Sequence, residues 1–98
     1  MSDKIHFDLG RVVATPGALK ALEASGQAPG DFLDRHANGD WGEVGRDDWA
    51  ANDSALRDGN RILSAYKTLK GAKIWIITEA AEEGGRREAT TVLLPDEY

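Results

Sequence analysis

The chain contains no cysteine, which excludes disulfide bonds, zinc sites built on thiolates and cysteine nucleophiles. Histidine is almost as scarce: with only His6 and His36, any metal site would need carboxylates for most of its ligands. No run approaches the roughly 20 apolar residues that cross a bilayer, and Met1 to Asp8 mix charged and apolar side chains where a secretion signal would be apolar. We therefore expect a cytoplasmic protein with no membrane contact, no metal and no cofactor.

Familiar catalytic motifs are also missing. The sequence has no glycine spacing of the Walker or Rossmann type, no GxSxG and no HExxH. Its composition is that of a folded domain, with 41% apolar and 30% charged residues and only eleven glycines and three prolines. A chain of 98 residues can close one hydrophobic core, so we expect a single domain spanning residues 1–98.

The helical signals come first in the chain. Residues 5–14 read as a strand interrupted at Gly10, and three short helices follow. Thr15 and Pro16 predict the start of the first helix and Gly26 its end, while Asp31 is expected to cap the second, which ends at Asn38. The third is predicted over Arg46 to Asp58, with Gly59 as its stop.

The last third of the chain changes to the period of strands. Residues 61–67, 73–78 and 89–94 predict a three-stranded antiparallel meander, and a mobile loop is expected over residues 81–88. We expect an α+β fold in which the three helices pack on one face of a four-stranded antiparallel sheet, the N-terminal strand lying at an edge. The predicted core residues are Leu19, Leu22, Phe32, Leu33, Trp49, Leu56, Ile74, Ile76 and Val92.

Acidic charge is concentrated in the middle of the chain. Asp31 to Asp58 holds eight acids and three bases, and this difference of five equals the net charge of −5. Such a field disfavours direct binding to nucleic acid, because counterion release needs clustered Lys and Arg. It is typical of a solvated helix face, and it also permits an acidic docking surface. The protein-binding candidates are Asp40, Trp41, Glu43, Asp47, Asp48 and Asp53. Asp53 lies in mid-helix, so its replacement is expected to change binding without changing stability.

A second group of side chains would suit catalysis. His36 ends a predicted helix, where it either caps carbonyl groups or acts as a general acid and base. Hydroxyls and an arginine on a sheet bind phosphate in small ribonucleases, although Thr and Tyr also favour strands for their own sake. The candidate catalytic set is His36, Arg61, Ser64, Tyr66, Thr78 and Thr91.

Several segments carry a family resemblance. They are Asp31 to Trp41 with the GDWG run, residues 61–66, the IWIITE run at 74–79 and residues 90–95. In these segments, and over nearly all of Leu9 to Tyr98, the chain resembles a family of small bacterial proteins from plasmids, phages and integrative elements. Its members are described as hypothetical or plasmid-related, and sometimes as type I restriction subunits. The resemblance implies a mobile-element setting and no particular reaction.

Two functions from different classes are compatible with these observations. The one we favour is an accessory interaction protein that docks its acidic surface on a host or element-encoded protein, such as a nucleic-acid-binding defence nuclease, and inhibits it. The alternative is a small metal-independent ribonuclease or toxin of the barnase, RelE and colicin type. Its basic cleft would have to come from Lys67, Lys70, Lys73, Arg86 and Arg87.

Overall fold

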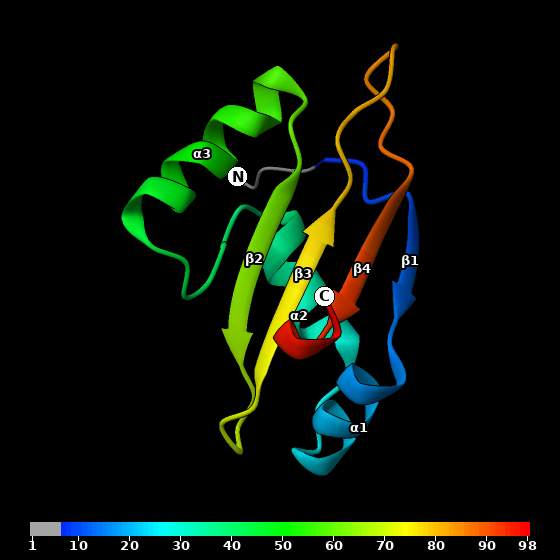
Figure 1. Cartoon of the computed structure of the whole chain (residues 1–98), viewed down its shortest axis with the longest axis vertical. Helices are drawn as coiled ribbons and strands as arrows, with labels where there is room; N and C mark the ends of the chain where they lie inside the picture. Colours follow the sequence, from blue (N-terminus) through cyan, green and yellow to red (C-terminus); the bar gives the residue numbers. More distant parts are fainter. Residues whose placement is uncertain (1–6) are drawn as a thin grey trace, which may run out of the picture.

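The order of elements follows the predicted change from helices to strands. The computed structural model describes residues 7–98 (Figure 1). Its elements are β1 (Arg11–Ala14), α1 (Pro16–Ala24), α2 (Pro29–Ala37), α3 (Arg46–Asp58), β2 (Ile62–Lys67), β3 (Lys73–Thr78), β4 (Ala89–Leu93) and the short 3-10 helix η1 (Pro95–Glu97). The α+β class is confirmed.

Local capping chemistry sets the helix ends. The Thr15 hydroxyl accepts a hydrogen bond from the Ala18 amide at 3.2 Å at the start of α1, as predicted. The prediction that Asp31 caps α2 was wrong by position: α2 begins at Pro29, and the Asp31 carboxylate, already inside the helix, accepts from the Ala28 amide at 3.0 Å. The bounds predicted for α3 are confirmed.

The sheet is mixed and not wholly antiparallel. Its strand order is β1-β4-β3-β2; the last three strands form the predicted antiparallel meander, but β1 pairs with β4 in parallel. Parallel neighbours need a long crossover, which the helices and the first two strands of the meander supply here. The expected strand over residues 5–14 shortens to β1, since Phe7 to Gly10 are irregular and residues 5 and 6 lie outside the described part.

Two helices cover one sheet face and build the main core. Ala18 and Leu22 of α1 and Phe32 of α2 pack with the inward side chains of the strands, namely Tyr66, Ile74, Ile76 and Val92. Most of the predicted core is buried or partly buried. Leu19 and Trp49 are exceptions, with exposed fractions of 46% and 36%. In each of their helices, the rest of the protein covers only part of the predicted apolar stripe.

The third helix occupies a different place from the one predicted. α3 lies alongside β2 at the edge of the sheet (Figure 1), and its buried Asn52 side chain bonds the backbone of Leu63 through both amide atoms, at 2.8 and 3.2 Å. Trp41 and Glu43 bond the backbone of Ala65 on the same edge. An exposed strand edge invites unwanted pairing, so these contacts protect β2.

None of the helices within residues 7–98 has the length and apolar character that a bilayer-spanning helix requires.

Candidate functional site

His36 lies at the centre of a buried chain of hydrogen bonds. It is fully buried in the last turn of α2, facing the sheet. Its Nδ1 is 2.5 Å from the Ser64 hydroxyl and its Nε2 is 2.8 Å from the Thr78 hydroxyl. Thr78 is in turn 2.8 Å from the Thr90 hydroxyl, which donates to the Leu9 carbonyl at 2.7 Å. The histidine therefore touches two predicted catalytic residues, Ser64 and Thr78.

The last acceptor fixes the direction of the whole chain. A carbonyl oxygen only accepts, so Thr90 uses its proton on Leu9 and must accept the hydrogen bond from Thr78. Thr78 then accepts from His36 Nε2, which carries a proton; in a neutral ring Nδ1 is the acceptor for the Ser64 hydroxyl. The proton of a neutral imidazole therefore lies on Nε2.

The surroundings of His36 favour the neutral ring. Burial lowers the pKa of His36 to about 4, and the positive charge of Arg87 acts in the same direction. The rings of Phe7 and Trp41 meet the imidazole edge-on at centroid distances of 5.4 and 5.6 Å. Ser64 and His36 have the contact of a nucleophile and its base, but both are fully buried and offer no access to a substrate.

The sheet separates the remaining members of the catalytic set. Tyr66 shares the inward face but donates its hydroxyl to the Asp40 carbonyl at 2.6 Å, and burial raises its pKa to about 12. Arg61 and Thr91 lie on the opposite face, where they line a hollow of about 210 Å³ beside Tyr98. Arg61 donates to the Tyr98 hydroxyl at 2.6 Å. The six side chains of the ribonuclease hypothesis thus do not meet at one accessible place.

The basic cleft of that hypothesis is also incomplete, because Arg87 is buried. Its guanidinium donates to the carbonyls of Ala55, Asn60 and Glu79 at 2.9 to 3.0 Å. These carbonyls lie in the last turn of α3, just before β2 and just after β3, so Arg87 joins three segments. The predicted mobile loop therefore ends in a fixed residue, and nothing in the residues around Arg87 signals this role.

The predicted acidic docking residues fall into two groups. Asp40 forms an ion pair with Arg35 at 2.7 Å, which lowers the pKa of Asp40. Trp41 is fully buried and donates its indole N–H to Asp53 at 3.0 Å. An indole held in the core offers no surface to a partner, so Trp41 supports the fold, and Asp53 is not the independent probe that was expected.

Glu43, Asp47 and Asp48 are exposed, as is Asp53 apart from its bond to Trp41. Within residues 7–98 the one ion pair closer than 4 Å is that of Arg35 and Asp40, so no basic group in this part of the chain lies within 4 Å of these four carboxylates. We call Asp47, Asp48 and Asp53 the acidic surface of α3. Trp49, missed by the prediction because its spacing matched a core position, adds an indole 36% exposed to the same helix.

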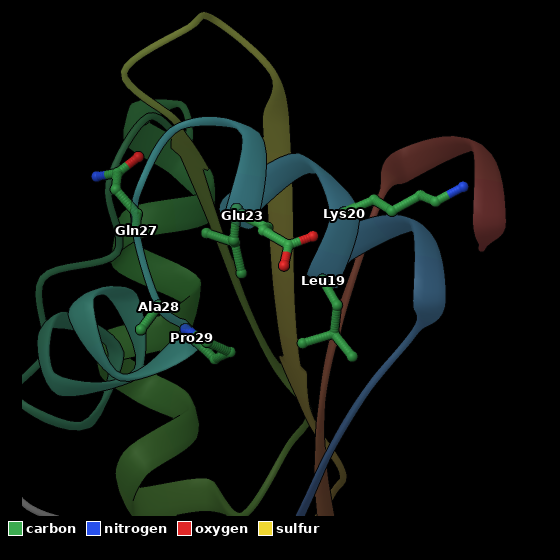
Figure 2. A pocket seen from close by; sticks show the side chains of 7 residues that line it. Leu19, Lys20, Glu23, Gln27, Ala28 and Pro29 are labelled. Carbon is green, nitrogen blue, oxygen red and sulfur yellow. The ribbon is translucent and has the colours of Figure 1, made fainter.

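Two further hollows lie at the surface. One of about 230 Å³ runs between α3 and β2 and is lined by Asp48, Ala51, Asn52, Arg61 and Leu63. Figure 2 shows the other, an apolar hollow of about 440 Å³ where α1 meets the start of α2. Leu19 and Pro29 line it, with Lys20 and Glu23 of opposite charge beside them, so its charge favours neither sign of ligand.

Across the part of the chain that the structure describes, no three His, Asp or Glu side chains gather closely enough to hold a metal ion. The chain matches no protein-family model, no curated protein and no solved structure.

Proposed function

We propose that the chain is an interaction protein that docks on a basic partner through the acidic surface of α3. The observation that carries this proposal is the exposure of Asp47, Asp48 and Asp53 with no basic group of residues 7–98 within 4 Å, on a helix that also exposes Trp49. Unneutralised carboxylates attract a basic surface over a Debye length of about 8 Å at physiological salt. A partly exposed tryptophan supplies the kind of apolar anchor that dominates binding energy in interfaces.

The nature of the partner follows from charge and from the resemblance. A protein whose own function is to bind DNA or RNA has the basic surface that α3 complements. The resemblance to proteins of plasmids, phages and integrative elements supports a host or element-encoded partner, and a defence nuclease is the partner we propose. By covering the basic cleft of such an enzyme, α3 would exclude its nucleic acid and inhibit it.

The experiment is capture of partners from the host by the tagged full chain, followed by mass spectrometry and measurement of association rates. The test variant combines Asp47→Asn, Asp48→Asn and Asp53→Asn, and the last of these changes keeps a side-chain oxygen as the acceptor for the Trp41 indole. We expect its association rate to fall about tenfold, and the loss to shrink as salt rises.

The matched control removes the same charge elsewhere. Glu82→Gln, Glu83→Gln and Glu88→Gln neutralise three exposed carboxylates in the loop between β3 and β4. Equal losses of association rate in both variants would show that net charge alone causes the effect. An association rate that changes neither with salt nor with the α3 substitutions would refute docking through α3. An RNA-cleaving activity of the natural chain that disappears in His36→Ala, in samples that circular dichroism shows to be folded, would instead favour the ribonuclease alternative.

A further inference from the structure

Lysines gather at the end of the molecule opposite the acidic helix. The described lysines are Lys20 on α1 and three at the β2–β3 hairpin: Lys67, Lys70 and Lys73. In Figure 1 the β2–β3 turn and α1 lie at one end of the long axis, whereas α3 lies beside β2 toward the other. We call the hairpin residues Lys67 to Lys73 the lysine tip. The molecule therefore carries opposite charge on two separate surfaces.

The charges of the lysine tip are not balanced within the chain. Lys67 and Lys73 stand directly opposite each other on adjacent antiparallel strands, and both are exposed. Like charges in this position destabilise a sheet. Among residues 7–98 no carboxylate lies within 4 Å of either ammonium group. An anionic group from outside the chain would relieve this repulsion.

The lysine tip is also held rigidly. The Leu69 amide donates to the Gln27 side chain at 3.0 Å and the Lys70 amide to the Ser25 hydroxyl at 3.2 Å. Thr68, 3% exposed, closes the turn through its hydroxyl, which accepts from the Ala72 amide at 3.0 Å. These bonds fix a turn on which Leu69 is 81% exposed. A binding partner would meet an apolar side chain whose backbone is already ordered, which lowers the entropy lost on binding.

We propose that the lysine tip of one copy of this chain binds the acidic surface of α3 on a second copy. The three ammonium groups complement Asp47, Asp48 and Asp53, and the exposed side chains of Leu69 and Trp49 provide the apolar contact. The two surfaces lie on different parts of the molecule (Figure 1), so the contact is head-to-tail. An association of this kind leaves one free surface of each sign at its ends and extends with concentration.

This self-association does not depend on the proposed function, but it would compete with it. A copy whose α3 is covered by a lysine tip has no acidic surface left for a basic partner. The amount of partner captured per chain would then decrease as the concentration of the chain rises. A variant without the lysine tip would retain α3 and would bind the partner at least as well as the natural chain.

Charge exchange tests the contact directly in the full chain, by sedimentation equilibrium at low ionic strength and at physiological salt. The tip variant carries Lys67→Glu, Lys70→Glu and Lys73→Glu. The helix variant carries Asp47→Lys and Asp48→Lys, and it keeps Asp53, which accepts the hydrogen bond of the Trp41 indole. We expect the natural chain to self-associate at low ionic strength and each variant alone to lose about tenfold in association constant. Mixed together, the two variants should associate again, because the natural lysine tip of the helix variant meets the natural α3 of the tip variant, and the two exchanged surfaces also carry opposite charge.

Circular dichroism of each variant checks that it is folded before association is compared. A third variant, Leu69→Ser, removes the apolar contact at an exposed position and should weaken association without changing charge. The proposal is overturned if the natural chain stays monomeric at low ionic strength, if the variants associate like it, or if their mixture gives no dimer. These outcomes leave partner capture through α3 untouched.

Discussion

Lowering the pH below neutrality should destabilise the fold through His36. The pKa of His36 is about 4 in the folded chain, against 6.5 for an ordinary histidine. Because the folded state prefers the neutral ring, the stability that this preference provides is complete above pH 6.5 and is lost as the pH falls from 6.5 toward 4. The full difference is worth about 3 kcal/mol, of which about 2 kcal/mol should be lost between about pH 7.5 and pH 5.

Structure explains why the proton is so unfavourable there. A second proton on the imidazole would sit on Nδ1 and would turn the acceptor of the Ser64 hydroxyl into a donor. It would also place a positive charge in the core near Arg87. Asp40, whose pKa is lowered by its hydrogen bond from Arg35, loses its contribution only at more acidic pH.

Urea unfolding followed by tryptophan fluorescence at a series of pH values measures this effect. His6→Gln should be the background, so that His36 is the one histidine left to titrate. In that background His36→Gln is expected to be less stable at neutral pH, since a buried polar group loses its partners, but to show almost no change between about pH 7.5 and pH 5. Equal pH dependence in both proteins, or an imidazole that titrates near 6.5 by NMR, would refute the buried neutral histidine.

The other buried contacts lead to three further expectations. Trp41→Phe should destabilise the fold by about 1 to 3 kcal/mol in urea unfolding, because the side chain loses core volume and the hydrogen bond to Asp53. An unchanged free energy of unfolding would contradict the place of Trp41 in the core. Arg87→Lys should cost about 2 to 4 kcal/mol and speed amide exchange at Gly59, since one ammonium cannot serve three carbonyls in the same geometry; unchanged exchange would contradict the joining role of Arg87. Glu97→Gln should speed exchange of the Gly17 amide, which donates to Glu97 at 3.2 Å, and an unaltered rate would show that this contact does not hold the start of α1.

The parts of the fold that depend on near neighbours were predictable from the sequence. A cap residue, a first-turn proline and a terminal glycine lie within a few residues of the structure they determine, and α1 and α3 begin and end where these signals stand. The start of α2 was missed because Asp31 fits the cap position and the third helical position equally well, and Pro29 decides between them.

Burial was less predictable, because periodicity shows which side chains share a helix face and not how much of that face is covered. Trp49 has the spacing of a core residue, yet α3 packs on a strand edge and leaves it exposed. Trp41 stands in a loop without any period, and its place in the core depends on Asp53 and on contacts across the fold.

The candidate catalytic set could have been divided in advance. Side chains alternate along a strand, so Arg61 and Ser64 point to opposite faces, as do Thr90 and Thr91. The contact of His36 with Ser64 could not have been predicted in this way, because the two residues are 28 positions apart and meet only when α2 packs on the sheet.

The buried network of hydrogen-bonded hydroxyl groups favours one register of β3 and β4. Thr78 and Thr90 are direct cross-strand partners, and His36 reaches the first of them. A slip of β4 by one residue would turn Thr90 to the opposite face and bring Thr91 or Ala89 beside Thr78. In the slip that brings Ala89 there, Thr78 would lose its acceptor, and an uncompensated polar group in the core costs about 1 to 3 kcal/mol. The slip that brings Thr91 there keeps a hydroxyl beside Thr78 but turns the fully buried Val92 out of the core. The network and the buried Val92 together align the strands, which accounts for a fully buried histidine without assigning it any chemistry.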